Sequence, residues 1–250
     1  IARPVPPKVE AFIAQHCDYE KWERNDPIPR AELLSKIGDV EGLYITGGKI
    51  DGELLDRAPA LKIVSNASVG YNNFDIEAMK KRKVIGTHTP SVLDDTVADL
   101  IIGLMVSAAR RIPELDRYVK EGKWKKSDVE TLFGLDVHHK TLGIIGLGRI
   151  GAAVAKRAKC GFDMDVLYHN RRRNAEAEEK WGAVYCTKEE LLRKSDFVLL
   201  MTPLTAETRH LMGKKEFSLM RESAIFINAS RGETVDEQAL LEALRTGQIR

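Results

Sequence analysis

Three short stretches of this 250-residue chain carry residues whose type and spacing suit chemistry. The first is the glycine pattern GLGRIG at 146–151, which comes directly after the apolar run at 142–145. The second is a run of three arginines at 171–173, and the third is Arg231, which follows the apolar segment 224–228. Glycine turns before a helix and guanidinium groups both suit the binding of phosphates or carboxylates.

The glycine pattern predicts the first turn of a dinucleotide fold. Gly146 allows a tight turn, Gly148 lets the backbone approach a pyrophosphate, and Gly151 lets helix and strand pack closely. A glycine-rich turn with a purely structural role is the alternative, but the preceding strand and the following helix favour the dinucleotide interpretation. The predicted cofactor ligands in this turn are Gly146, Leu147, Gly148, Arg149, Ile150 and Gly151.

The end of the next predicted strand, 166–168, indicates which dinucleotide is bound. An NAD site places a carboxylate about 20 residues beyond the glycines, where it accepts hydrogen bonds from the ribose. This chain has Asn170 there, followed by Arg171, Arg172 and Arg173. Because clustered guanidinium groups attract a 2'-phosphate, we expect NADPH to be preferred and NADH to bind more weakly. A solvated arginine loop is the alternative.

Two more loops are predicted to face the cofactor, because they leave the carboxyl ends of strands in a parallel sheet. They contain Thr202 and Pro203 after one strand, and Ala229, Ser230 and Arg231 after another. The Arg231 guanidinium can pair with a substrate carboxylate and polarise a neighbouring carbonyl. A surface arginine without a role is the alternative at that position.

The elements that must position these residues alternate regularly between strand and helix. This pattern predicts an α/β protein of two Rossmann-like domains, each a doubly wound parallel sheet with helices on both faces. We expect a substrate domain at 1–88 and a dinucleotide-binding domain at 89–250, which opens with a long helix at 91–110. In the first domain, the loops at 46–48 and 68–73 suit either a carboxylate or a simple turn.

Composition limits the class of protein. Apolar residues make up 43% of the chain and charged residues 30%, which is typical of a globular protein, and the net charge of +2 gives no reason to expect a nucleic acid or membrane partner. Cys17, Cys160 and Cys186 lack metal-ligand spacing, so we expect free thiols and a cytoplasmic protein. We expect Trp124, in a basic loop, to be a packing anchor.

Five segments of the sequence resemble the D-2-hydroxyacid dehydrogenase family, and most closely its glyoxylate, hydroxypyruvate and 2-ketogluconate reductases. The resemblance implies hydride transfer from NADPH to the carbonyl carbon of a small 2-oxo acid, giving a D-2-hydroxy acid, in a homodimer that meets at the long helix and its neighbour. The matching segments are SVGYNNFD (68–75), TPSVLDDTVADL (89–100), GIIGLGRIG (143–151), SDFVLLMTPLTAETRHL (195–211) and AIFINASRGETVDEQAL (224–240).

The resemblance also assigns roles to individual residues. It implies that Arg231 is the catalytic, substrate-binding arginine and that the amides of Val69 and Gly70, with Ser68, hold the substrate carboxylate. It places a threonine near the nicotinamide at Thr96, and the pyrophosphate turn at 148–150. The remaining predicted cofactor ligands are Asn170, Arg171, Arg172, Thr202, Pro203, Thr208, Ala229, Ser230 and Arg231.

One part of the family pattern has no match. The family uses a histidine as general acid, oriented by a glutamate, and both follow the segment that contains Arg231. None of the six histidines here matches, and we interpret all six as structural or solvated. We therefore expect the catalytic histidine and glutamate beyond Arg250, in a segment that completes both sheets.

Two other functions remain open from the sequence. One is an NAD(H)-sensing binding protein of the corepressor type, which the arginine cluster disfavours. The other is a fragment that binds the cofactor without turnover.

Overall fold

The computed structural model describes residues 1–128 and 130–250. These residues form two compact units, Ile1–Val92 and Leu93–Arg250. Each unit is built around a parallel β-sheet. In the described ranges, no helix combines the length and the apolar character needed to cross a lipid bilayer.

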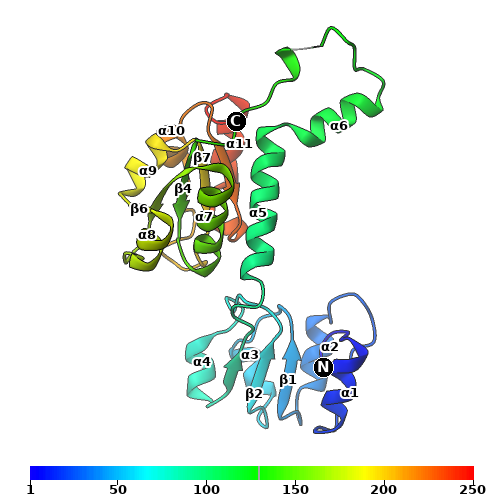
Figure 1. Ribbon diagram of the computed structural model, residues 1–250. Helices are drawn as coiled ribbons and strands as arrows, with labels where there is room; N and C mark the ends of the chain where they lie inside the picture. Colours follow the sequence, from blue (N-terminus) through cyan, green and yellow to red (C-terminus); the bar gives the residue numbers. More distant parts are fainter. Residues whose placement is uncertain (129) are drawn as a thin grey trace. The chain divides into compact units, whose positions relative to one another are not determined.

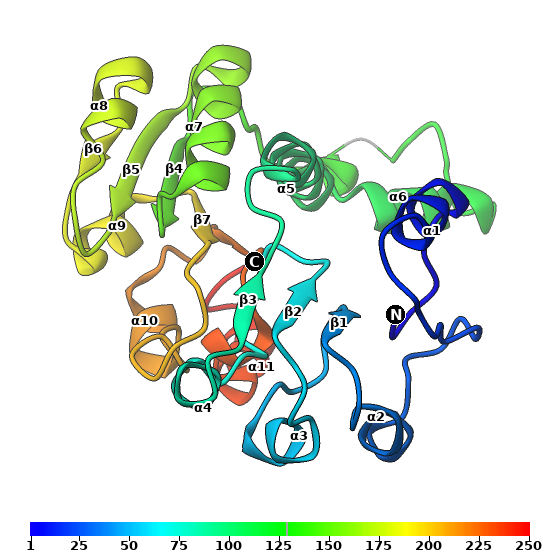
Figure 2. The same cartoon turned by 90° about the horizontal axis from the view of Figure 1, so that it is seen from below.

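The first unit contains a three-stranded parallel sheet in the order β1-β2-β3. Gly42 pairs with Ile63 and Ile63 pairs with Ile85, so the strands start level with one another. Helices α2, α3 and α4 lie along one side of this sheet (Figure 2). The elements are α1 (Pro7–Ala14), α2 (Arg30–Lys36), β1 (Gly42–Ile45), α3 (Gly52–Arg57), β2 (Ile63–Asn66), α4 (Ile76–Lys81) and β3 (Ile85–Thr87).

The core of the first unit lies between the sheet and these three helices. Leu43 and Val64 point into it from the strands, and Leu54 from α3 is fully buried there. Residues in the alternate strand positions are more open: Ile63 is 38% exposed and Ile85 62%. This alternation follows the two-residue period of a strand.

The second unit contains a five-stranded parallel sheet in the order β6-β5-β4-β7-β8. In chain order this is 3-2-1-4-5, the strand order of a dinucleotide-binding sheet, and the chain reverses direction across the sheet between β4 and β7. The predicted α/β class with parallel sheets and flanking helices is therefore confirmed. The strands are β4 (Thr141–Ile145), β5 (Asp165–His169), β6 (Val184–Tyr185), β7 (Phe197–Leu200) and β8 (Ile225–Asn228).

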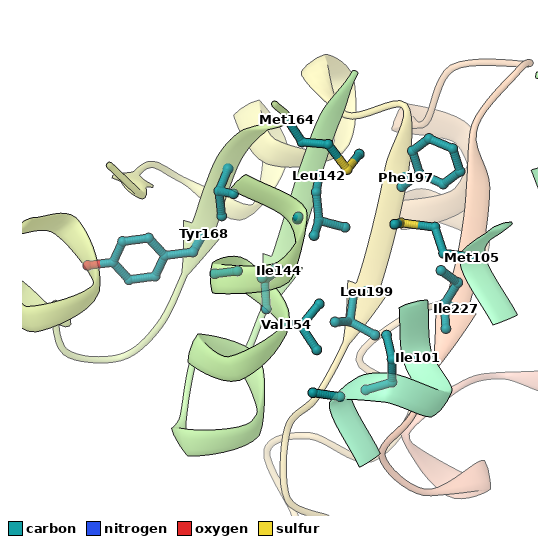
Figure 3. Packing of buried hydrophobic residues seen from close by; sticks show 14 of the residues in the cluster. Ile101, Met105, Leu142, Ile144, Val154, Met164, Tyr168, Phe197, Leu199 and Ile227 are labelled. Atoms are coloured by element: carbon teal, nitrogen blue, oxygen red, sulfur yellow. The ribbon is translucent and has the colours of Figure 1, made fainter. Parts of the chain in front are cut away.

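Helices cover both faces of the five-stranded sheet (Figure 1). Leu199 lies on the face that α5 and α7 cover, where Figure 3 shows it beside Ile101 and Val154. Its neighbour Leu200 lies on the opposite face, against the residues of α9, α10 and α11. The helices are α5 (Asp94–Ala109), α6 (Ile112–Lys120), α7 (Arg149–Phe162), α8 (Ala175–Trp181), α9 (Lys188–Lys194), α10 (Lys214–Leu219) and α11 (Glu237–Arg245).

Local sequence signals set the ends of several elements. Asp51 caps α3 by accepting a hydrogen bond from the amide of Leu54, and Asp236 caps α11 in the same way. Gly247 follows α11 with a φ of 70°. One expectation was wrong: Trp124 is 58% exposed, so it does not anchor its loop by packing among the described residues.

Candidate active site

The glycine turn joins β4 to the N-terminus of α7, and each of its glycines has a different surrounding. Gly146 has a φ of 101°, and a Cβ there would lie 2.8 Å from the backbone of Met201. A Cβ on Gly151 would lie 3.1 Å from the carbonyl oxygen of Gly146. A Cβ on Gly148 would meet nothing within 4 Å. Gly146 is thus required by the fold and Gly151 allows a close contact, whereas Gly148 leaves open space above the turn.

Backbone amides face this open space. Gly148 is the N-cap residue of α7 and provides no side-chain cap. The amides of Arg149, Ile150 and Gly151 are the first three of the helix, where no intrahelical acceptor exists. The Arg149 side chain contacts Asp94 of α5, with Nε 3.1 Å from Oδ2, while Oδ1 of Asp94 is buried and has no hydrogen-bond partner in the described chain. Because the first three amides of α7 have no intrahelical acceptor, the turn fits a pyrophosphate.

Asn170, at the end of β5, holds the glycine turn in place. Its Oδ1 accepts a hydrogen bond from the Leu147 amide at 2.7 Å, and its Nδ2 donates to the Leu147 carbonyl at 3.0 Å. Asn174 donates to the same carbonyl at 3.1 Å and also caps α8. The side-chain amide of Asn170 thus fixes the glycine turn relative to the end of β5, where we expect the ribose of the cofactor to bind. The sequence alone did not reveal Asn174; the signal available was a second asparagine just before a helix.

The three arginines that follow Asn170 have different surroundings. Arg173 forms a two-pronged pair with Glu178, with N–O distances of 2.9 and 2.8 Å, and its guanidinium lies 5.6 Å from the ring centre of Tyr185. Hydrogen bonds, from Arg173 first and Tyr168 second, lower the pKa of the Glu178 carboxyl. Figure 3 shows the ring and hydroxyl of Tyr168 directed away from the other labelled side chains.

Arg171 and Arg172 are exposed, and neither forms a hydrogen bond or an ion pair with the described residues. The charge of Arg171 still reaches the loop after β7: the pKa of Glu207 lies below its usual value, through a hydrogen bond with Thr205 first and the Arg171 charge as a smaller cause. Two guanidinium groups are therefore available at the end of β5, and the third is bound to a carboxylate.

The loop after β7 contains the predicted ligands Thr202, Pro203 and Thr208. Thr208 closes this loop, because its hydroxyl donates to the Pro203 carbonyl at 2.6 Å and accepts from the Thr205 amide at 2.8 Å. The Thr202 hydroxyl oxygen is buried and has no hydrogen-bond partner in the described ranges. Its backbone amide lies directly against Gly146, so this loop borders the glycine turn.

The loop after β8 carries Ala229, Ser230 and Arg231 in a fixed backbone conformation. The Ala229 amide donates to Leu200 of β7 at 3.1 Å, which continues the sheet pairing. The Arg231 carbonyl accepts hydrogen bonds from Asn228 at 2.9 Å and from the buried Thr234 hydroxyl at 2.6 Å.

The Arg231 side chain itself is exposed, and its Nη1 donates to the Ser230 carbonyl at 2.8 Å. The guanidinium thus stands on a rigid loop at the carboxyl end of the sheet, where a carboxylate can reach it. Its two backbone supports, Asn228 and Thr234, were not predicted from the sequence.

The remaining predicted residues lie at the start of α5 and in the loop that follows β2. Thr96 is exposed in the first turn of α5. In the first unit, Ser68, Val69 and Gly70 follow β2, and the amides of Val69 and Gly70 donate to no acceptor among the described residues. Gly47 and Gly48, in the neighbouring loop, have φ values of 71° and 70°, and Asn73 donates to both of their carbonyls. The positive φ values therefore explain why glycine stands at both positions of this turn.

Among the described residues, the side chains of five of the six histidines form a ring contact or a hydrogen bond. His88 and His169 each have Nδ1 near a backbone carbonyl, at 3.0 Å from Val69 and 2.9 Å from Cys186. His16 packs on Phe12, and His138 packs on His139. His210 lies in an exposed turn with a φ of 51°.

Comparison with known proteins identifies this arrangement. A model of the D-isomer specific 2-hydroxyacid dehydrogenase NAD-binding domain matches residues 102–250. A glyoxylate/hydroxypyruvate reductase B of Yersinia pestis (strain Pestoides F) is 46% identical over 247 residues, which is 99% of this chain and 76% of the relative. The chain belongs to the D-2-hydroxyacid dehydrogenase family.

Solved structures agree with that assignment. The TT0316 protein of Thermus thermophilus matches with a TM-score of 0.89 and 40% identity, over 98% of this chain and 77% of the other. An acyclic imino acid reductase, solved with NADPH and D-Arg, matches with a TM-score of 0.89 and 26% identity over 99% of this chain and 78% of the other. As a D-2-hydroxyacid dehydrogenase, the protein is an oxidoreductase with an NAD(P)-binding domain.

Proposed function

We propose that this dehydrogenase reduces a small 2-oxo acid of the glyoxylate, hydroxypyruvate or 2-ketogluconate type to the D-2-hydroxy acid, using NADPH. The observation that carries the proposal is the open space above Gly148, which a run of helix-terminal amides faces at the reversal point of the sheet. Glyoxylate and hydroxypyruvate come from the name of a relative, the glyoxylate/hydroxypyruvate reductase B of Yersinia pestis, and 2-ketogluconate comes from the sequence resemblance.

The chain's own residues would bind and orient both reactants. Residues 146–151 would hold the pyrophosphate through backbone amides, and Thr202 would offer its unpaired hydroxyl at the edge of the same turn. When bound, a reduced nicotinamide supplies a hydride. Arg231 would pair with the substrate carboxylate and polarise the carbonyl that accepts this hydride. Val69 and Gly70 would donate amides to the same carboxylate, and Thr96 would lie near the nicotinamide.

The preference for NADPH is supported by the surroundings of the arginines. Arg171 and Arg172 have no carboxylate partner in the described chain, and Asn170 replaces the carboxylate that would repel a 2'-phosphate. Two guanidinium groups at this position would form charge-assisted hydrogen bonds with the phosphate. Ala229, Ser230, Pro203 and Thr208 would complete the cofactor contacts through the loops after β7 and β8.

The substrate assignment is tested with steady-state kinetics of the full-length protein. We expect NADPH to be oxidised in the presence of glyoxylate, hydroxypyruvate or 2-ketogluconate, and kcat/KM for the three acids ranks them as substrates. A chain that binds NADPH but oxidises it with none of these acids would contradict the proposed activity.

We also propose a homodimer whose contact includes α5 and α6. Beyond the side chains of α5 that pack on the sheet, Leu100 is 60% exposed and Leu104 is 47% exposed. On α6, Ile112 is 50% exposed and Val119 is 58% exposed. An apolar stripe of this kind on consecutive helices suits a second copy of the chain.

Two broader assignments accompany this proposal. We propose that residues 1–88 act as the substrate domain and 89–250 as the dinucleotide-binding domain. A cytoplasmic location would suit the three cysteines, which are all free thiols. Fractionation of cells that express the protein from its own gene would test the location.

A further inference from the structure

The loop after β2 has an unusual feature: each carbonyl at residues 68–70 accepts a hydrogen bond from outside that tripeptide. Asn66, at the end of β2, donates from Nδ2 to the Gly70 carbonyl at 2.8 Å. Asn66 is only 1% exposed, so this donor is held within the core of the first unit. The other two donors come from the chain that follows β3.

His88 and Thr89 supply these two donors. The Thr89 amide donates to the Ser68 carbonyl at 3.0 Å, and Nδ1 of His88 lies 3.0 Å from the Val69 carbonyl. Because a carbonyl oxygen can only accept, Nδ1 of His88 must carry the proton in this contact. The His88 ring also packs edge-on against Tyr71, with 5.0 Å between ring centres.

Fixing these carbonyls also fixes the amides of the loop. A peptide unit is planar and trans, so its C=O and the N–H of the next residue point in opposite directions. The bond to the Ser68 carbonyl therefore sets the direction of the Val69 amide. In the same way, the contact between His88 and the Val69 carbonyl sets the direction of the Gly70 amide. The Val69 and Gly70 amides therefore point away from His88 and Thr89. Neither amide has an acceptor in the described residues.

We propose that His88 is a positioning residue for the substrate carboxylate. This inference rests on the proposed function, in which the amides of Val69 and Gly70 hold that carboxylate. The imidazole does not contact the substrate in this account; it keeps the Gly70 amide oriented before the substrate arrives. Preorganised donors bind an anion more strongly because their orientation costs no free energy on binding.

The test compares two substitutions at this position. His88→Leu removes the donor, whereas His88→Asn keeps an N–H donor at nearly the position of Nδ1. For His88→Leu we expect KM for the 2-oxo acid to rise about fivefold to tenfold, the size of one lost hydrogen bond, with KM for NADPH unchanged. His88→Asn should restore KM to near the wild-type value. His16→Leu is the matched control, because the ring of His16 packs on Phe12 in the same unit and bonds to no loop carbonyl among the described residues.

A second readout needs no turnover. Hydrogen exchange of the Thr89 amide, which donates to the Ser68 carbonyl, should be faster by NMR in His88→Leu than in the wild type and His16→Leu, because the loop loses one tether. Unchanged exchange would overturn the inference, and so would an unchanged substrate KM in an active enzyme. Equal losses in His88→Leu and His88→Asn would also overturn it. A wild-type protein that reduces no 2-oxo acid would instead overturn the proposed function.

Discussion

Neighbouring residues of one type have different tasks in this site, and their contacts distinguish them. The three arginines after β5 carry the same charge in the sequence. In the structure, Arg173 forms an ion pair with Glu178 and its guanidinium lies over the ring of Tyr185. Arg171 and Arg172 have no such partners among the described residues. The choice between NADPH and NADH is therefore assigned to two of the three.

The double substitution Arg171→Ala, Arg172→Ala should raise KM for NADPH about tenfold or more, since each charge-assisted hydrogen bond to a phosphate contributes about 1.5–3 kcal/mol. KM for NADH should change little, because NADH has no 2'-phosphate. Arg173→Ala serves as the matched control and should affect both cofactors equally. An equal loss for both cofactors in the double variant would refute the assignment.

Arg231 tests the substrate side of the site. Arg231→Ala should lower kcat/KM for the 2-oxo acid by at least about a hundredfold, since it removes the carboxylate partner and the group that polarises the carbonyl. Arg231→Lys should recover only part of this, because an ammonium cannot form the two-pronged pair. Affinity for NADPH, measured by fluorescence titration, should stay near the wild-type value. Retained turnover in Arg231→Ala would contradict this role.

At the scale of the element, the glycine turn separates folding from binding. Gly146→Ala should destabilise the protein by about 2 kcal/mol or more, because the position has a positive φ and the new methyl group would overlap the Met201 backbone. Gly148→Ala should leave the unfolding temperature unchanged, since its methyl group would have open space within 4 Å among the described residues. We expect it instead to weaken NADPH binding, because the methyl group would occupy the space above the turn. Calorimetric unfolding and cofactor titration of both variants distinguish the two effects.

A second prediction concerns α9 and α10, which Lys188 and Glu216 join at 2.8 Å. Burial raises the pKa of the Glu216 carboxyl, but the hydrogen bond from Lys188 and its charge outweigh burial, so the pKa lies below its ordinary value. A carboxyl whose pKa is lowered on folding stabilises the folded state above its unfolded pKa, and this contribution is lost as the pH falls through the lowered value.

Lys188→Met should therefore lower the free energy of unfolding by about 1 kcal/mol at pH 7, near the upper end for a partly exposed pair. The difference from the wild type should shrink as the pH falls below the ordinary range of a glutamate. Lys215→Met is the control, since its pair with Glu189 is far more exposed, at 73% and 59%. A difference that stays constant down to acid pH would refute the linkage to Glu216.

The sequence predicted most elements of the second unit because each has its own local signal. The β4 strand, the glycine turn and α7 follow from hydrophobic spacing and glycine placement, and α8 and α9 each begin after a capping side chain, Asn174 and Thr187. Helix α2 was missed: it has seven residues and begins after Pro29, with only Leu33 buried. So short a helix has too little periodicity to be distinguished from a loop.

Contacts between loops were beyond the reach of sequence patterns. The two hydrogen bonds of Asn170 to Leu147 join residues 23 positions apart, and they depend on how the ends of β4 and β5 meet. The pairing of Arg173 with Glu178 joins residues five positions apart, a spacing that no helix rule singles out. The bonds of His88 and Thr89 to the loop at 68–70 depend on the register of β2 and β3.

At the scale of the whole molecule, the exposed apolar side chains of α5 bear on the oligomeric state. Leu100→Glu combined with Leu104→Glu should turn the proposed homodimer into a monomer in sedimentation or size-exclusion experiments, because charges would replace these side chains. Leu241→Glu with Leu244→Glu is the matched control on α11, where the two leucines are 39% and 48% exposed. A wild-type monomer, or a dimer that both pairs leave intact, would contradict the proposed contact.

The central claim is that residues 146–151 hold a nicotinamide dinucleotide for the reduction of a 2-oxo acid. Its most direct test is to incubate the full-length protein with NADPH and hydroxypyruvate and to determine the amount and handedness of the product. The account predicts one D-glycerate for each NADPH oxidised, and faster turnover with NADPH than with NADH at low cofactor concentration. Oxidation of neither cofactor, or formation of the L-product, would contradict it.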